Sequence, residues 1–353
     1  MTATEPKLLL VTFPVDLGSR TTAHNLEKLL IGKMNVRVYP FTGRLAQHFD
    51  SRGVDRRANR WQRIVEIPRL WVELRAARKE NRKILFHHIS PALFSLPLLS
   101  RRDCFITTEW TRKLLEPIKL ETISPWWLTW VHRMVLRRVA GVLPMTEAVR
   151  TSLLQDYHVG PSQVHRVAKP FEVERMRPTS EECHFPVKIL FIGGDFERKG
   201  GDVLINWFKT KNPKSVQLTL VTNERVAAIT GLHLERGVVP RSKKHTKLFQ
   251  SHDVFALPTK SEGYPMVLGE AACYGLAIVT TKFAMGAPEI IENGANGYIC
   301  ESQEHVLSCL DDLCANPAKV WQMKIASRRR MLTHFGEDKV FQQYLKAIFG
   351  SES

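Results

Sequence analysis

Short apolar runs recur along the chain, and each is followed by polar sequence of helical character. Such continuous runs predict buried parallel strands, and strands that alternate with helices are typical of an α/β fold. We expect strands at 7–13, 36–41, 83–88, 104–108 and 142–146 in the first half, and at 187–192, 216–222, 237–240, 254–257 and 276–281 in the second. The pattern therefore predicts parallel sheets in both halves of the chain.

The intervening segments have the periodicity and end signals of helices. We expect these helices at 21–31, 61–79, 125–138 and 147–157, from Pro265 to a C-terminal cap at Gly275, and from 304 onward. Pro68 either interrupts the 61–79 helix or begins its real part. The segment Lys169–Pro178 is polar, contains prolines and lacks a clear period, so it predicts a domain boundary with a cleft between the two sheets.

Composition narrows the class of protein. The 353 residues suffice for two domains, and there is neither a long apolar run nor a signal-peptide pattern, so we expect no transmembrane helix. The six cysteines show no paired spacing, which favours a cytoplasmic location; with no Asp-x-Asp motif, we expect no metal site. The net charge of +16 attracts nucleic acid, anionic membranes or anionic substrates without choosing among them.

Two loops carry candidate chemistry. In the first, Glu262 follows a strand and Glu270 lies in the next helix, whose N-terminus suits a phosphate. Glu270 suits the diol of a ribose, and Glu262 reaches beyond the phosphates. The second loop, Gly193–Gly201, places the cations Arg198 and Lys199 after a strand, where we expect them to stabilise an anionic ligand; the alternative is a solvated basic loop.

The spacing Glu262-x7-Glu270, within PTKSEGYPMVLGEAACYGLAIVTT, resembles the signature of retaining glycosyltransferases of the GT-B type, in particular glycosyltransferase family 4. The resemblance covers the C-terminal half well and the N-terminal half in outline. It implies two facing Rossmann-like domains: 1–170 for the acceptor, 171–333 for the nucleotide sugar, and a C-terminal helix, 334–353, that packs back on the first domain. The implied reaction is metal-independent transfer of a hexose from a UDP- or GDP-sugar, with the leaving phosphate as base and no permanently bound cofactor.

The resemblance also implies site residues. The catalytic candidates are Arg198, Lys199, Glu262 and Glu109; the donor-binding candidates are Gly18, Gly193, Gly194, Arg198, Lys199, Glu262, Gly263, Tyr264, Pro265, Met266, Val267 and Glu270. Gly194 departs from the family pattern, which has arginine there, so Arg198 supplies the guanidinium or the protein is catalytically silent. Glu109 lies beside the sugar or complements a helix dipole, and Gly18 lies near the donor or acceptor or forms an ordinary turn.

The segment 126–138 bears on the binding partners of the protein. Three tryptophans and several basic residues in 126–138 suit a helix at an anionic membrane surface, which makes a lipid-linked or cell-envelope saccharide the expected acceptor. In the alternative, Trp127, Leu128, Val131 and Val135 belong to the core. A basic nucleic-acid-binding protein is a rival class, but the cations are dispersed and no known module is visible, so we expect no nucleic-acid partner.

Overall fold

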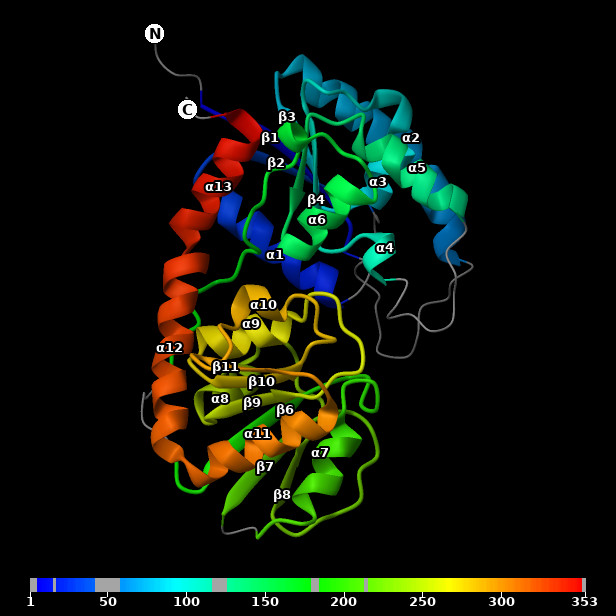
Figure 1. Cartoon of the computed structure of the whole chain (residues 1–353). Coiled ribbons are helices and arrows are strands. Elements are labelled where there is room, and N and C mark those ends of the chain that lie inside the picture. Colours follow the sequence, from blue (N-terminus) through cyan, green and yellow to red (C-terminus); the bar gives the residue numbers. More distant parts are fainter. Residues whose placement is uncertain are drawn as a thin grey trace. The chain divides into compact units, whose positions relative to one another are not determined.

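The computed structural model describes residues 5–14, 17–41, 58–115, 126–178, 184–212 and 215–350 (Figure 1). The chain forms two compact units. The first comprises Met1–Pro170 together with Glu337–Ser353, and the second comprises Phe171–Gly336. The chain therefore leaves the first unit after Pro170 and returns to it for its last helix.

The first unit contains a five-stranded parallel sheet in the order β2-β1-β3-β4-β5. Its strands are β1 (Lys7–Thr12), β2 (Asn35–Pro40), β3 (Lys83–Phe86), β4 (Cys104–Thr108) and β5 (Gly141–Pro144). Its described helices are α1 (Leu17–Leu30), α2 (Ala58–Lys79), α3 (Ile89–Phe94), α4 (Arg112–Leu115), α5 (Trp126–Leu136), α6 (Glu147–Gln155) and α13 (Glu337–Phe349).

Alternation along β1 divides the core of this unit between the two faces of the sheet. Leu9 and Val11 belong to a cluster that includes Leu74 of α2. Leu8 and Leu10 belong to a second cluster, which includes Tyr344 of α13. Figure 1 shows α13, in red, close to α1, in blue. The C-terminal helix thus supplies part of the core of the N-terminal unit.

The second unit contains a six-stranded parallel sheet in the order β11-β10-β9-β6-β7-β8. Its strands are β6 (Val187–Ile192), β7 (Val216–Val221), β8 (Leu232–Glu235), β9 (Val254–Leu257), β10 (Ala277–Thr281) and β11 (Gly297–Cys300). Its described helices are α7 (Gly201–Phe208), α8 (Lys243–Gln250), α9 (Met266–Cys273), α10 (Ala287–Ile290), α11 (Gln303–Ala315) and α12 (Pro317–Phe335).

Most predicted strands are confirmed to within two residues, but two local predictions are wrong. Residues 237–240 form no strand: Gly237 has a left-handed φ of 63° and donates its N–H to the side chain of Asn223, and the nearby strand is β8. Pro68 neither stops nor starts α2, which continues on both sides of it. The loss of one backbone donor is tolerated because Leu70 and Leu74 bury the following turns.

The tryptophan-bearing helix α5 has a mixed environment. Val135 is fully buried, so that part of the core interpretation is confirmed, and Leu128 and Val131 are partly buried. Trp127 and Trp130 are 51% and 58% exposed, so Trp127 is not a core residue. Among the described helices, none is both long and apolar enough to cross a bilayer.

One buried ion pair connects the sheet of the second unit to α12. The carboxylate of Asp253, which is fully buried, lies 2.8 Å from Nζ of Lys324, and the two side chains are 0% and 5% exposed. Asp253 also accepts a hydrogen bond from the backbone N–H of Lys188, at the start of β6. The ring of His184, which is 37% exposed, also lies 2.9 Å from this carboxylate, so Lys324 is its buried cationic partner.

We predict that Lys324→Met lowers the free energy of unfolding by about 3 kcal/mol, because it leaves the buried Asp253 carboxylate with only the half-exposed ring of His184 and backbone N–H groups as partners. Urea denaturation followed by circular dichroism measures the change. Lys319→Met is the matched control on the same helix, since Lys319 pairs with Asp312 at the surface. Equal destabilisation by the two substitutions would contradict the importance of the buried pair.

Candidate active site

Two loops of the second unit lie side by side because their strands are neighbours. Strand β6 pairs in parallel with β9, so the segments that follow their carboxyl ends share one edge of the sheet. The backbone N–H of Lys260, after β9, donates to the carbonyl of Arg198, after β6, at 2.8 Å. The fold therefore brings together the two loops that sequence analysis selected.

Arg198 joins these loops through its side chain. Its Nε donates to Oδ2 of Asp195 at 2.6 Å, and its Nη1 donates to Oε2 of Glu262 at 3.0 Å and to the carbonyl of Ser261. Partial burial opposes the charged form, but the carboxylates of Asp195 and Glu262 raise the pKa of Arg198. The guanidinium is therefore fixed in position and permanently charged.

Lys199 adds a second cation to the same carboxylate. Its Nζ lies 3.5 Å from Oε2 of Glu262, and both side chains are 19% exposed. Glu262 thus contacts Arg198 and Lys199 with one oxygen. Two cations held in place before a ligand arrives can stabilise an anion with little reorganisation. The role of Arg198 and Lys199 in binding a diphosphate stays a prediction.

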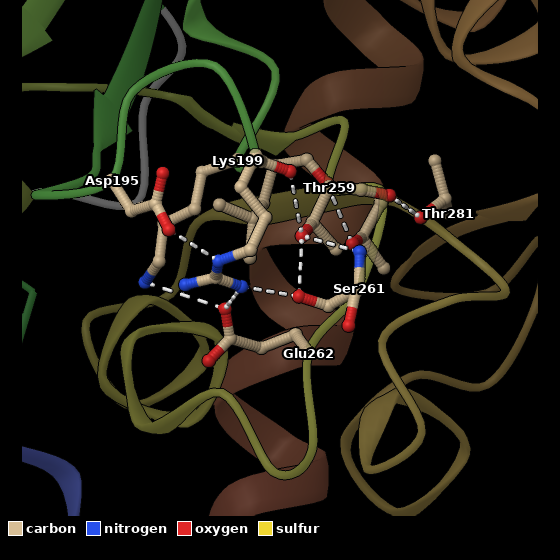
Figure 2. Close-up of polar contacts among 9 residues, drawn as sticks. Asp195, Lys199, Thr259, Ser261, Glu262 and Thr281 are labelled. Atoms are coloured by element: carbon tan, nitrogen blue, oxygen red, sulfur yellow. Dashed lines mark hydrogen bonds and ion pairs between the residues drawn. The ribbon is translucent and has the colours of Figure 1, made fainter. Parts of the chain in front are cut away.

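The loop that carries Glu262 is tied to its surroundings by hydrogen bonds. Thr281, at the end of β10, donates through Oγ1 to the carbonyl of Thr259 at 2.5 Å (Figure 2). The backbone of Glu262 donates to the carbonyl of Phe283 at 3.0 Å and accepts from Met285 at 3.1 Å. The position of the Glu262 side chain is therefore set by a rigid backbone rather than by a free loop.

Glycines allow the close approach of these loops. Gly200 has a left-handed φ of 81°, and a Cβ there would lie 2.2 Å from the carbonyl oxygen of Pro258. Gly194 is different, because a Cβ at that position would meet nothing within 4 Å. The position at which the resembled family has arginine is therefore open space here, and the guanidinium of this loop is that of Arg198.

Glu270 lies further along the same segment, buried in α9, and lines a small pocket. The other residues that line this pocket are Glu172, Arg175, Met176, Arg241, His245, Thr246 and Tyr274. Burial raises the pKa of Glu270 to about 7; the charge of Arg241 opposes this rise and that of Glu172 adds to it. A buried carboxyl group beside hydrogen-bonding side chains can bind a diol.

The residues that line the pocket with Glu270 were not predicted from the sequence. Glu172 lies within the predicted linker, and Arg241 directly follows the strand wrongly predicted at 237–240. In the structure, Oε1 of Glu172 lies 3.6 Å from Nε of Arg241, whose backbone φ is 65°. A positive φ at a non-glycine residue is uncommon and marks a constrained position, but neither signal can be seen in the sequence.

Glu109 and Gly18 belong to the first unit. Oε2 of Glu109 lies 2.6 Å from Nζ of the fully buried Lys169. Burial alone would raise the pKa of Glu109, but Lys169, helped by His87 and a hydrogen bond to Thr22, lowers it. Oγ1 of Thr22 lies 3.1 Å from the carbonyl oxygen of Gly18. Glu109 precedes α4 and so lies outside its first turn.

We predict that Glu270 makes stability depend on pH. Its pKa in the folded protein is raised from 4.5 to about 7, so the stability that its protonated form contributes is complete below about pH 4.5 and is lost as pH rises through about 7. Between pH 4.5 and 8, Glu270→Gln should therefore gain about 3 kcal/mol in unfolding free energy relative to wild type.

Urea denaturation at several pH values measures this difference between wild type and Glu270→Gln. Glu197→Gln, which replaces an exposed glutamate of the same unit, is the control and should follow the wild-type curve. Parallel curves for wild type and Glu270→Gln would show that Glu270 is not held in the protonated form.

Comparison with solved structures defines the class of fold. The protein HepE of Anabaena, solved in complex with UDP, superposes with a TM-score of 0.70 at 13% identity, covering 97% of this chain and 98% of that one. The glycosyltransferase of Rickettsia africae gives a TM-score of 0.70 at 12% identity, covering 99% and 100%. The chain has two parallel-sheet α/β domains of the GT-B glycosyltransferase fold, as predicted.

Sequence comparison also relates the second unit to glycosyltransferases. Residues 186–316 match the family described as Glycosyl transferases group 1, so this unit carries a domain of that type. An uncharacterized glycosyltransferase of Haemophilus influenzae is 28% identical over 215 residues, which are 58% of this chain and 59% of that protein. The chain thus spans less than two thirds of the length of this curated relative.

Proposed function

We propose that this protein is a retaining glycosyltransferase that moves a hexose from a nucleoside diphosphate sugar to a saccharide acceptor. The observation that carries the proposal is the joining of Arg198 and Lys199, after β6, to Glu262, after β9. Parallel α/β sheets bind ligands at this edge, and paired cations there suit a diphosphate.

Each residue has a chemical role in this proposal. Arg198 and Lys199 bind the diphosphate and stabilise the charge that develops as the glycosidic bond breaks, so no metal is needed for the transfer. Glu262 orients both cations and accepts a hydrogen bond from the sugar. Glu270 accepts hydrogen bonds from the ribose hydroxyls, in the pocket that it forms with Arg241 and Glu172.

The backbone completes the proposed donor site. Gly193 and Gly194 bring the first loop close to the phosphates. The segment Gly263–Val267 leads into α9, and the dipole at the N-terminus of a helix favours a phosphate there. Retention follows the resembled family, in which departure and attack occur on one face with the leaving phosphate as base.

The donor is proposed by comparison. HepE of Anabaena has been solved with UDP and with UDP-glucose. We infer that UDP-sugars are the first donors to test here and that GDP-sugars are the alternative. For Glu109, we propose a place beside the transferred sugar, where its ion pair with Lys169 keeps it ionised.

A catalytically silent protein with the same fold is the second candidate. The observation that favours it is Gly194, which leaves empty the space where the resembled family carries a guanidinium. Such a protein would still bind the nucleotide through Lys199 and Glu270 but would not break the glycosidic bond. Binding and turnover therefore have to be measured separately.

We predict that Lys199→Ala lowers donor turnover by about 10²–10³-fold, because it removes one of two charges that stabilise the leaving group. Hydrolysis or transfer of UDP-glucose and GDP-mannose is followed by release of the nucleoside diphosphate. Glu270→Ala should weaken binding of UDP or GDP, measured by thermal shift and calorimetry.

Lys209→Ala is the matched control, since it removes an exposed lysine of the same unit, just after α7. It should leave both turnover and binding unchanged. Nucleotide binding without turnover in wild type would support the silent protein. Equal activity of wild type, Lys199→Ala and Glu270→Ala would remove the site assignment.

A lipid-linked or cell-envelope acceptor requires access to a membrane surface, and we propose that α5 provides it. Trp127 and Trp130 are one turn apart and largely exposed, and Arg137 and Arg138 follow as exposed cations. Aromatic rings beside cations suit the interface of an anionic bilayer. The protein would then act at the cytoplasmic face as a peripheral enzyme.

We predict that the double substitution Trp127→Ala, Trp130→Ala reduces binding to vesicles that contain anionic phospholipid by about tenfold or more, because it removes the apolar part of the interface. Vesicle sedimentation measures the bound fraction. Trp321→Ala, at an exposed tryptophan of α12, is the control. If the double substitution leaves vesicle binding unchanged, the exposed tryptophans of α5 do not bind the membrane surface.

A further inference from the structure

Two thiols and an imidazole meet at the edge of the sheet in the second unit. Cys300 is the last residue of the edge strand β11 and is fully buried. Cys309 lies in α11, on the same helical face as His305, because positions four apart in a helix are neighbours. Ser302 caps α11 by accepting a hydrogen bond from the N–H of His305 at 3.2 Å. The tight connection from β11 to α11 thereby brings the three side chains together.

The geometry of this cluster fits a metal ion. One ligand atom from each of Cys300, His305 and Cys309 lies within 4.8 Å of the other two. The two sulfur atoms are 3.7 Å apart. Two sulfurs bound to one tetrahedral zinc ion, each at about 2.3 Å, are separated by about 3.8 Å, so the thiols already have the required spacing.

We propose that Cys300, His305 and Cys309 form a binding site for a thiophilic divalent cation, with Zn²⁺ as the expected ion. Sulfur and imidazole ligands favour Zn²⁺ over Mg²⁺ and Ca²⁺, which prefer oxygen. Because His305 is exposed and Cys309 is partly exposed, solvent can reach the site and supply the fourth ligand. The spacing Cys-x4-His-x3-Cys is not one of the paired motifs by which zinc sites are usually found in a sequence.

The site would stabilise the loops that form the candidate active site. The carbonyl of Cys300 accepts a hydrogen bond from the N–H of Lys282 at 2.8 Å, directly after β10. The side chain of Gln303 donates to the carbonyl of Pro258 at 2.6 Å, directly before the Thr259–Glu262 loop. A cation that fixes the turn between β11 and α11 therefore strengthens two attachments of neighbouring loops. This role is structural and does not depend on the proposed glycosyl transfer.

Metal titration of the full chain tests the proposal. The protein is reduced, treated with a chelator, and titrated with Co²⁺ and then Zn²⁺. We expect one Co²⁺ per chain with a thiolate-to-cobalt charge-transfer band, and displacement of Co²⁺ by Zn²⁺. His305→Ala, at an exposed position, and Cys309→Ser should each weaken Zn²⁺ binding by more than about tenfold. Both should also lower the gain in Tm on adding Zn²⁺.

Cys314→Ser is the matched control, since Cys314 is also a partly exposed cysteine of α11 but lies outside the cluster. It should keep the stoichiometry, the affinity and the charge-transfer band. Absence of that band in wild type, or equal Zn²⁺ affinity in wild type, His305→Ala and Cys309→Ser, would overturn the proposal. A disulfide between Cys300 and Cys309 in the protein as purified under reducing conditions, found by mass spectrometry, would overturn it as well.

Discussion

The candidate active site depends on one ion pair, between the guanidinium of Arg198 and the carboxylate of Glu262. These residues belong to different loops and come together only because β6 and β9 are paired neighbours. The same guanidinium binds Asp195 in its own loop and the carbonyl of Ser261 in the other. A charged group that satisfies several acceptors is held in one orientation. The ion pair thus joins the two loops at one edge of the sheet.

Much of the fold could be predicted from the sequence because its sheets are parallel and buried. The run 254–257 is apolar throughout and the run 187–192 is apolar except at Lys188, and this property predicts both their structure and their limits. Gly275, which was predicted as the C-terminal cap of a helix, has the left-handed φ of 75° that such a cap requires. The strand predicted at 237–240 is wrong because Gly237 has a left-handed φ and Val239 is exposed, so this apolar run is not buried in a sheet.

The site was predictable only where its residues lie in the loops themselves. Arg198, Lys199 and Glu262 follow strand ends, so sheet topology alone brings them together. The pairing of Glu109 with Lys169, and of Glu172 with Arg241, joins residues that are far apart in the sequence and whose environment is set by packing. The raised pKa of Glu270 has the same origin, since burial is its main cause. Such long-range contacts cannot be predicted from a local sequence pattern.

The return of the chain to its first unit has a consequence for biosynthesis. Val340, Tyr344 and Ile348 of α13 complete a core that begins with Leu8 and Leu10. At about 5–20 residues per second, a ribosome needs on the order of 10 s to pass from Pro170 to α13. During that interval the part of the cluster that α13 covers stays exposed in the nascent N-terminal half, whereas the second unit is complete once Gly336 has been made. The unit whose synthesis begins first therefore completes its core last. Its exposed apolar surface is the part of the nascent chain most prone to aggregate or to bind a chaperone.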